Sequence, residues 1–247
     1  MTKTHLLQAK GETLDTFFHG RILVLQKKKG YRFAVDAPLL ASSVEVQIGD
    51  ELCELGTGCG IVSLLLSVRP FRHVTALEIQ KPLAGLATRN MKLNGLETKI
   101  SVVRADLNKF HPRRRFDVVF SNPPYIKKQQ GSLSKSAEKS IAKHEMKCDI
   151  LGVMRAAGTL LKKQGKAFFI FPAKRRRDFE EAAAEAGLAV TGLRFVHSRQ
   201  GAPAILFLAR CGFKPGGPVV RPPLVLFKAG GTYTAEVRRI FAGRFDA

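Results

Sequence analysis

The string Ser-Asn-Pro-Pro-Tyr at residues 121–125 combines residue types that could carry out chemistry together. A planar amide or ring-bound amine nitrogen is a poor nucleophile, because its lone pair is delocalised into the π system. Two acceptors directed at its two N–H bonds would localise that lone pair and aim it at an activated methyl group. The Asn122 side-chain carbonyl and the Pro123 backbone carbonyl could supply these acceptors.

The other residues of the string favour the same chemistry. The two prolines restrict the backbone and would hold the acceptors in place. Tyr125 offers a flat face on which a planar target could stack. We therefore expect methyl transfer to a planar, amide-like nitrogen, with Asn122, Pro123 and Tyr125 as catalytic residues. The alternative is a Pro-Pro turn that only ends a strand, with the tyrosine used for packing.

A glycine-rich loop upstream could bind the cofactor that carries the methyl group. Gly56, Gly58 and Gly60 lie in the run Glu54–Gly60, where a predicted strand ends and a predicted helix begins. Glycines at such a place allow a tight turn and let a ligand approach the backbone. Alone, the loop is equally typical of an NAD-binding protein or of a simple tight turn. Because a cofactor would carry the activated methyl, we expect neither a metal ion nor a nucleophilic side chain.

Four acidic residues could complete a site for S-adenosyl-L-methionine. Glu78 ends the next predicted strand, near the spacing at which a carboxylate binds the ribose hydroxyls of a nucleoside cofactor. Asp106 follows the third strand and could accept a hydrogen bond from the cofactor's adenine amine; both acids could instead be exposed strand-end carboxylates. Glu54 could face the methionine ammonium group or only interact with the following helix dipole. Asp36 could approach the cofactor or serve as a helix N-cap.

These residues need elements that bring them to one place, and the chain shows a regular alternation of strand and helix patterns. The alternation predicts an α/β, Rossmann-like fold with a mostly parallel sheet of seven strands, the last two forming an antiparallel hairpin. The expected strands are Glu51–Leu55, His73–Glu78, Lys99–Arg104, Phe116–Ser121, Ala167–Phe171, Ala189–Val196 and Ala204–Ala209, and the expected helices among them are Ile61–Ser67, Pro82–Leu93, 150–161 and Arg176–Ala186.

Residues 1–48 are expected to form a small N-terminal cap that covers the cofactor, and residues 49–247 a Rossmann-like domain with a C-terminal tail. The cap contains a short alternating run from Arg21 to Gln26 and a helical pattern from Asp36 to Val44. The Lys- and Ser-rich stretch 127–147 predicts a polar surface segment. The Pro/Gly-rich tail precedes a possible amphipathic helix, Thr234–Phe241, so we expect it to pack on the domain.

The charge of the chain indicates a polyanionic partner. There are 41 Lys and Arg residues against 20 Asp and Glu residues, a formal charge of +21. The basic residues cluster in Lys27–Lys29, Arg113–Arg115 and Arg175–Arg177, which favours nucleic acid binding over a merely solubilising surface. The four cysteines lack the spacing of a zinc site or a disulfide framework. Neither a signal peptide nor a membrane-spanning run is recognisable, so we expect a cytoplasmic protein.

Together these motifs resemble the NPPY-type Rossmann methyltransferases, and more narrowly the tRNA(Val) adenine-N6 methyltransferase family. The resemblance implies a class I methyltransferase fold, S-adenosyl-L-methionine as cofactor, and methylation of the adenine beside the anticodon of a valine tRNA. The Lys-rich segment departs from the family pattern. The resemblance rests on the Gly-Tyr-Arg-Phe string with Asp36, on Glu54–Gly60, Glu78, Asp106 and Asn122–Tyr125, and on the flanks at His144-Glu145, Pro223–Val225 and Tyr233-Thr234.

Other functions remain open at this stage. Glutamine N5-methylation of a protein needs the same two acceptors, although those enzymes usually carry a larger helical domain ahead of the glycine loop. A non-catalytic RNA-binding protein could also retain this scaffold. DNA adenine methylation would need more room for a duplex-reading domain. We favour a structured RNA with an unpaired adenine, bound by the basic runs that flank Phe116–Ser121 in the sequence, Arg113–Arg115 and Lys127-Lys128.

Overall fold

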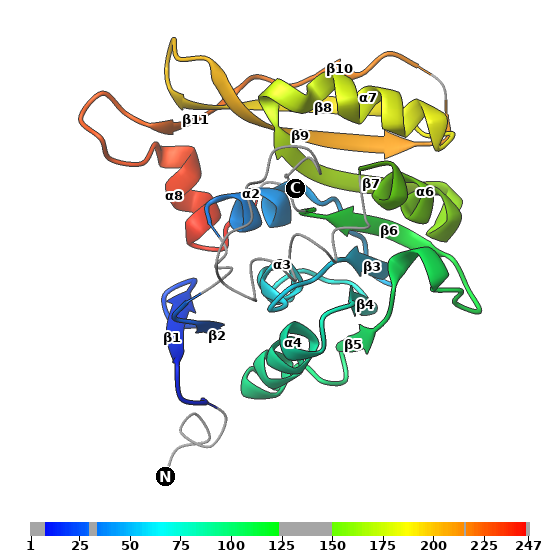
Figure 1. The fold of residues 1–247 in the computed structure, drawn as a ribbon. Helices are drawn as coiled ribbons and strands as arrows, with labels where there is room; N and C mark the ends of the chain where they lie inside the picture. The colour runs from blue at the N-terminus through cyan, green and yellow to red at the C-terminus, as the bar shows by residue number, and fades with distance from the viewer. Residues whose placement is uncertain (1–7, 30–33, 124–149, 215, 246–247) are drawn as a thin grey trace, which may run out of the picture.

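The structure is a computed structural model that describes residues 8–29, 34–123, 150–214 and 216–245. These residues form a nine-stranded sheet in the order β10-β8-β9-β7-β6-β3-β4-β5, with β11 also paired to β8 (Figure 1). Strand β9 is antiparallel to its neighbours β7 and β8, and the other pairs are parallel. The strands of this sheet are β3 (Glu51–Leu55), β4 (His73–Glu78), β5 (Ile100–Arg104), β6 (Phe116–Ser121), β7 (Leu161–Pro172), β8 (Ala189–Arg199), β9 (Ala204–Gly212), β10 (Val219–Val220) and β11 (Leu224–Phe227).

The predicted α/β fold is confirmed. All seven predicted strands are present, and β8 and β9 form the expected antiparallel hairpin. The tail adds β10 and β11, which the sequence pattern did not predict. The helices are α2 (Asp36–Ser43), α3 (Ile61–Leu66), α4 (Lys81–Leu93), α6 (Ile150–Leu160), α7 (Arg176–Glu185) and α8 (Ala235–Phe241), with short 3-10 turns η1 (Leu107–Lys109) and η2 (Ala173–Arg175).

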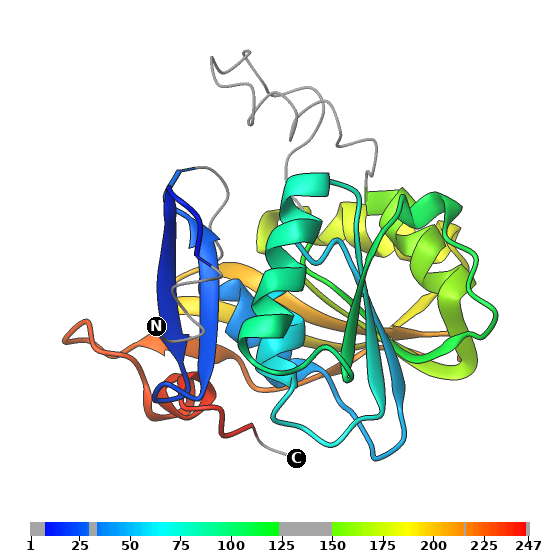
Figure 2. The same cartoon turned by 90° about the horizontal axis from the view of Figure 1, so that it is seen from below.

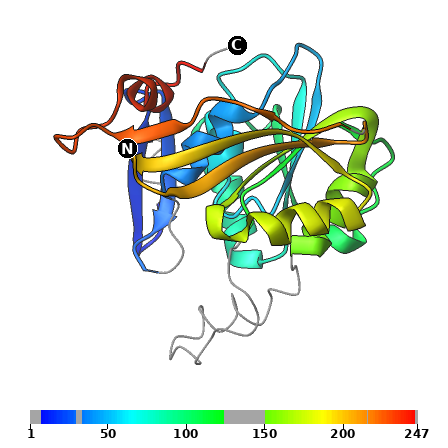
Figure 3. The ribbon, with the colours of Figure 1, turned by 90° about the horizontal axis from the view of Figure 1, so that it is seen from above.

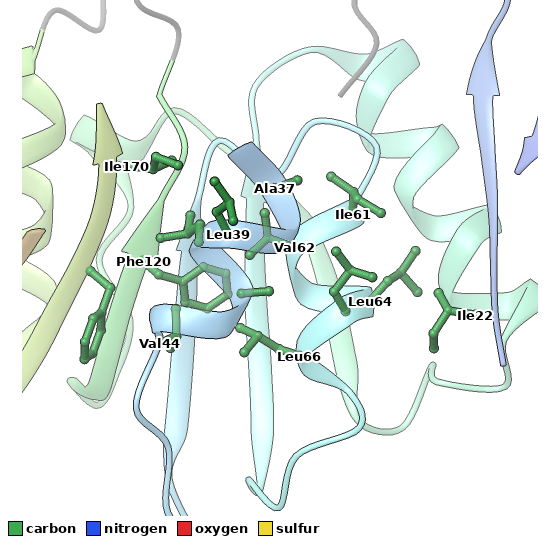
Figure 4. Close-up of a cluster of buried hydrophobic side chains, with 14 of the residues drawn as sticks. Ile22, Ala37, Leu39, Val44, Ile61, Val62, Leu64, Leu66, Phe120 and Ile170 are labelled. Carbon is green, nitrogen blue, oxygen red and sulfur yellow. The ribbon is translucent and has the colours of Figure 1, made fainter. Parts of the chain in front are cut away.

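The sheet separates two hydrophobic clusters, because alternate residues of a strand point to opposite faces. In β7, Phe168 and Ile170 belong to the cluster that contains α2, α3 and α8 residues, and Figure 4 shows part of this cluster. Phe169 and Phe171 belong to the second cluster, which is covered by α6 and α7. Figure 3 shows these two helices together beside the sheet, in yellow-green. Both faces of the sheet are therefore buried, as expected for parallel strands.

The chain begins with a separate two-stranded hairpin, β1 (Glu12–Phe17) and β2 (Ile22–Lys27). The hairpin stands beside α4 (Figure 2). Strand β2 agrees with the predicted alternating run, whereas β1 was not predicted. The predicted Lys- and Ser-rich segment 127–147 lies outside the described residues. Within the described part of the chain, every helix is too short or too polar to cross a membrane.

Asn90 of α4 and Asn94, the C-cap residue of α4, dock the hairpin through side-chain hydrogen bonds to the backbone of β2. The Leu25 N–H donates to Asn90 Oδ1 at 2.7 Å, and Asn90 Nδ2 donates to the Leu25 carbonyl at 2.9 Å. Asn94 makes the same two bonds with Leu23, at 2.9 and 2.7 Å. We call Asn90 and Asn94 the asparagine pair. Positions i and i+4 share one helix face, and alternate strand residues share one strand edge, so the two spacings match.

We expect Asn90→Ala to lower the free energy of unfolding by about 3–5 kcal/mol. Asn90 is fully buried, and its removal would leave three backbone groups without a partner: the Leu25 N–H and the carbonyls of Leu25 and Cys59. The matched variant Asn94→Ala removes the same side chain from a partly exposed position, where water can replace it, and should cost about 1–2 kcal/mol. Urea unfolding measures both. Equal losses would contradict the role of burial.

Candidate active site

The glycine-rich loop between β3 and α3 adopts backbone angles that glycine accepts most easily. Gly56, Gly58 and Gly60 have φ values of 71°, 60° and 85°. At Gly60 a Cβ would lie 2.5 Å from Met91 Cε and 3.3 Å from Ala87 Cβ, so this glycine also lets the loop pack on α4. At Gly56 a Cβ would meet no atom within 4 Å, and the residue is exposed. The loop is therefore packed at its end and open at its beginning.

Glu54 lies beneath this loop, with 2% of its surface exposed. Its Oε2 accepts a hydrogen bond from Thr57 Oγ1 at 2.6 Å and another from Ser63 Oγ. Burial raises the pKa of the carboxyl group to about 7; the hydroxyls of Ser63 and Thr57 counteract this, and the Glu78 charge adds to it. Glu54 thus connects the loop to the first turns of α3. Contact with a methionine ammonium group stays a prediction.

Glu78 ends β4 and braces the same loop. Its Oε2 accepts a hydrogen bond from the Gly58 N–H at 2.9 Å, and its Oε1 accepts one from the Gln80 N–H at 2.8 Å. The side chain is 5% exposed. A carboxylate can accept about four hydrogen bonds, so these two contacts are compatible with further donors from a ligand. The predicted ribose contact stays a prediction.

The other two predicted acids occupy less buried positions. Asp106 follows β5, and its Oδ1 accepts a hydrogen bond from the Asn108 N–H at 3.0 Å, which caps η1. The Ala105 N–H donates to the Glu78 carbonyl at 3.1 Å, so Asp106 is held next to the end of β4. Asp36 is the first residue of α2 rather than its N-cap, and it accepts a hydrogen bond from the Ala37 N–H at 3.0 Å. The predicted cofactor contacts of Asp106 and Asp36 stay predictions.

The motif after β6 is tied directly to the glycine loop. Ser121 is fully buried, and its Oγ donates to the Leu55 carbonyl at 2.7 Å, one residue before Gly56. Asn122 is partly buried and Pro123 is buried. Tyr125, the third predicted catalytic residue, lies outside the described residues. This hydrogen bond therefore joins the start of the glycine loop to the start of the Asn-Pro motif.

The structure brings most of the predicted site residues to one edge of the sheet. Strands β6, β3, β4 and β5 are adjacent and parallel, so their carboxyl ends lie side by side. These four ends carry, in that order, Asn122, the glycine loop after Leu55, Glu78 and Asp106. Ligands of open α/β sheets bind at this edge. Among the residues that the structure describes, no group of three or more His, Cys, Asp or Glu side chains could hold a metal ion.

Sequence reasoning missed several residues that organise this edge. Ser121 was part of the motif but was given no role, although a hydroxyl at the end of an apolar strand is a signal for a buried hydrogen bond. Thr57 and Ser63 could have been connected to Glu54 only through the fold. Asn90 was missed as well: its Nδ2 donates to the Cys59 carbonyl of the loop at 2.8 Å.

Comparisons with known proteins show which sequences this chain is similar to. Residues 32–174 match the model of the family described as methyltransferase small domain. A tRNA1(Val) (adenine(37)-N6)-methyltransferase from Bacteroides thetaiotaomicron is 31% identical over 68% of this chain and 71% of its own length. A protein of the same name from Actinobacillus pleuropneumoniae is 23% identical over 95% of this chain and 97% of its own length.

The fold likeness extends to solved structures. A protein described as a predicted O-methyltransferase from Agrobacterium tumefaciens aligns with a TM-score of 0.69, covering 86% of this chain and 98% of that chain. The two sequences are 22% identical, so the likeness concerns the fold alone.

We expect the stability of the cofactor-free protein to fall as the pH rises from about 4.5 to about 7, in part because of Glu54. Its folded pKa lies above its ordinary value, so the folded state binds the proton more tightly and loses that advantage as the pH passes through this range. For a fully buried group the loss is on the order of 3 kcal/mol. Glu54→Gln cannot titrate and should lack this part of the decline. Urea unfolding of both proteins between pH 5 and pH 8 measures the difference; parallel curves would mean that Glu54 is already ionised at pH 5.

Proposed function

This chain belongs to the methyltransferase small domain family, and from that premise we propose that it uses S-adenosyl-L-methionine to methylate the N6 amine of an adenine in tRNA. The observation that carries the proposal is the Ser121–Leu55 hydrogen bond, which joins the Asn-Pro motif to the glycine loop. Without that motif, the glycine loop would be equally typical of an NAD-dependent dehydrogenase. A motif that stands beside the loop fits group transfer between two bound molecules.

Two features of the carboxyl edge support this cofactor, the open space beside the loop and the acidic side chains around it. The open space at Gly56 admits a ligand against the backbone. Glu78 would hold the ribose hydroxyls and Asp106 the adenine amine, because both follow strand ends on the β4 and β5 side of the loop. Glu54 and Asp36 would add negative charge near the methionine part. When bound, the cofactor supplies a methyl group activated by a sulfonium.

The chain's own residues would prepare the target nitrogen. The Asn122 side-chain carbonyl and the Pro123 carbonyl would accept the two N6–H hydrogen bonds and hold the amine so that its lone pair is no longer delocalised into the ring. Such contacts strengthen as positive charge develops on the nitrogen, and each is worth about 2.7–4 kcal/mol by analogy with oxyanion donors. The prolines restrict the backbone that carries these acceptors. Tyr125 would stack on the base.

A tRNA substrate is supported by the relatives and by the charge. Two relatives quoted above are named for adenine(37)-N6 methylation of tRNA1(Val). The formal charge of +21 suits a polyanionic substrate. We therefore extend the proposal to the adenine beside the anticodon of a valine tRNA, which places the enzyme in the cytoplasm with its substrate. Glutamine N5-methylation of a protein is the second candidate, because a carboxamide nitrogen needs the same two acceptors.

Incubation with methyl-labelled cofactor and separate tRNA, DNA and protein pools tests the proposal. We expect label in the tRNA pool, recovered after digestion as N6-methyladenosine. Methylglutamine as the only labelled product would mean that the substrate is a protein and not RNA. Cofactor binding without methyl transfer to any pool would indicate a non-catalytic RNA-binding protein.

We expect Asn122→Ala to lower kcat by about 10²–10³ while leaving the cofactor dissociation constant within about threefold, because the carbonyl acts mainly in the transition state. Asn122→Asp keeps an acceptor oxygen and should retain more activity than the alanine variant. Steady-state kinetics and calorimetry with the cofactor separate the two effects. A loss confined to KM would mean that Asn122 only positions the substrate.

A further inference from the structure

The three basic runs of the sequence occupy different places in the fold. Arg113–Arg115 directly precede β6, whereas Asn122 directly follows it. A strand of six residues spans about 20 Å. These arginines are exposed at the amino edge of the sheet, opposite the candidate active site. Proximity in sequence to the catalytic motif therefore does not place them beside the target base, and the contact predicted for them is not supported by the geometry.

The second run is balanced by acids of its own helix. Arg175 forms an ion pair with Asp178 at 3.1 Å. Arg176 pairs with Glu180 and Arg177 with Glu181, each at 2.7 Å and with i,i+4 spacing. Each arginine thus has an acid three or four residues later, so the positive charge of this run is balanced by nearby acids. Such a surface has little attraction for a polyanion.

The third run lies at the end of β2. Strand β2 is antiparallel to α4, because Leu23 bonds to Asn94 and Leu25, two residues later, bonds to Asn90. The end of β2 therefore points toward the start of α4 at Lys81, which follows Glu78 at the carboxyl edge of the sheet. Lys28 and Lys29 continue in that direction and are exposed. Among the described residues, neither lysine has an ion-pair partner.

The hairpin that carries these lysines is firmly held. Besides the asparagine pair, Arg89 of α4 makes two hydrogen bonds to Glu12 of β1, at 2.7 and 2.5 Å. Glu12 is 8% exposed, and Arg89 lowers the pKa of its carboxyl group, so the pair persists near neutral pH. Asn90 also bonds to Cys59 in the glycine loop. The basic end of the hairpin thus has a defined position relative to the cofactor loop.

We propose that the hairpin β1–β2 is an RNA-contacting arm of this enzyme, and that Lys28 and Lys29 bind phosphates of the tRNA strand that presents the target adenine. The inference rests on the proposed function, since it requires an RNA substrate. Lysine ammonium groups bind phosphates as point charges without reading sequence. The arm would position the strand at the carboxyl edge, while the motif at Asn122 selects the nitrogen.

Two double variants with the same loss of charge test this arm. We expect Lys28→Ala with Lys29→Ala to raise the KM for tRNA about fivefold or more at 0.1 M salt. It should also reduce the slope of log affinity against log salt by about 1.4, or about 0.7 for each phosphate that is no longer neutralised. The cofactor dissociation constant and kcat should stay within about twofold. The matched control, Arg113→Ala with Arg114→Ala at the other edge, should match the wild type in all four measurements.

The remaining outcomes each have one meaning. Equal effects of the two double variants would contradict the arm, because they would mean that RNA binding depends only on the total positive charge. If the lysine variant gives wild-type values while the wild type methylates tRNA, the arm proposal is wrong and the proposed function stands. Failure of the wild type to methylate any RNA would overturn both. All four side chains are exposed, so unfolding should change by less than about 0.5 kcal/mol, which urea unfolding verifies.

Discussion

The candidate site depends on the parallel order of β6, β3, β4 and β5, since parallel strands bring their carboxyl ends to one edge of a sheet. Residues from four separate stretches of the chain meet there only because of this order. The hydrogen bond from Ser121 to the Leu55 carbonyl then joins the ends of β6 and β3 directly. A buried hydroxyl-to-carbonyl bond costs much to break, so the relative position of the loop and the motif is constrained.

The acids at this edge have two physical tasks. Glu54 and Glu78 both accept hydrogen bonds from the glycine loop itself, so these two acids fix the shape of the loop. Burying the Glu54 carboxylate is unfavourable and is the main cause of its raised pKa, and the charge of nearby Glu78 adds to that cost. A cationic ligand would relieve that cost. The positive charge of the proposed cofactor would therefore favour its binding beside Glu54 and Glu78.

Much of this arrangement could be predicted from sequence, because the local signals were strong. The bounds of β4 and β6 agree with the predicted strands, since each is an apolar run ended by a polar or turn residue. Strand β1 was missed because its buried residue is Glu12, whose partner Arg89 lies 77 positions away. The first half of β7 was missed because it is exposed and rich in lysine. In the sequence Asn90 is typical of a polar helix face, but its hydrogen-bond partners are backbone groups of Leu25 and Cys59, which are remote in sequence.

Net charge alone does not define an interaction surface. The value of +21 belongs to the whole chain, but its basic runs differ in ways that only the fold reveals. One is neutralised within its own helix, one lies at the far edge, and one continues a hairpin strand toward the carboxyl edge. Electrostatic attraction falls off over about 8–10 Å at physiological salt, so charges separated by the length of a strand act on different parts of a ligand. In the proposed complex, contacts with the neighbouring nucleotides would set the position of one base against Asn122, and side chains at the carboxyl edge are the ones placed to make those contacts.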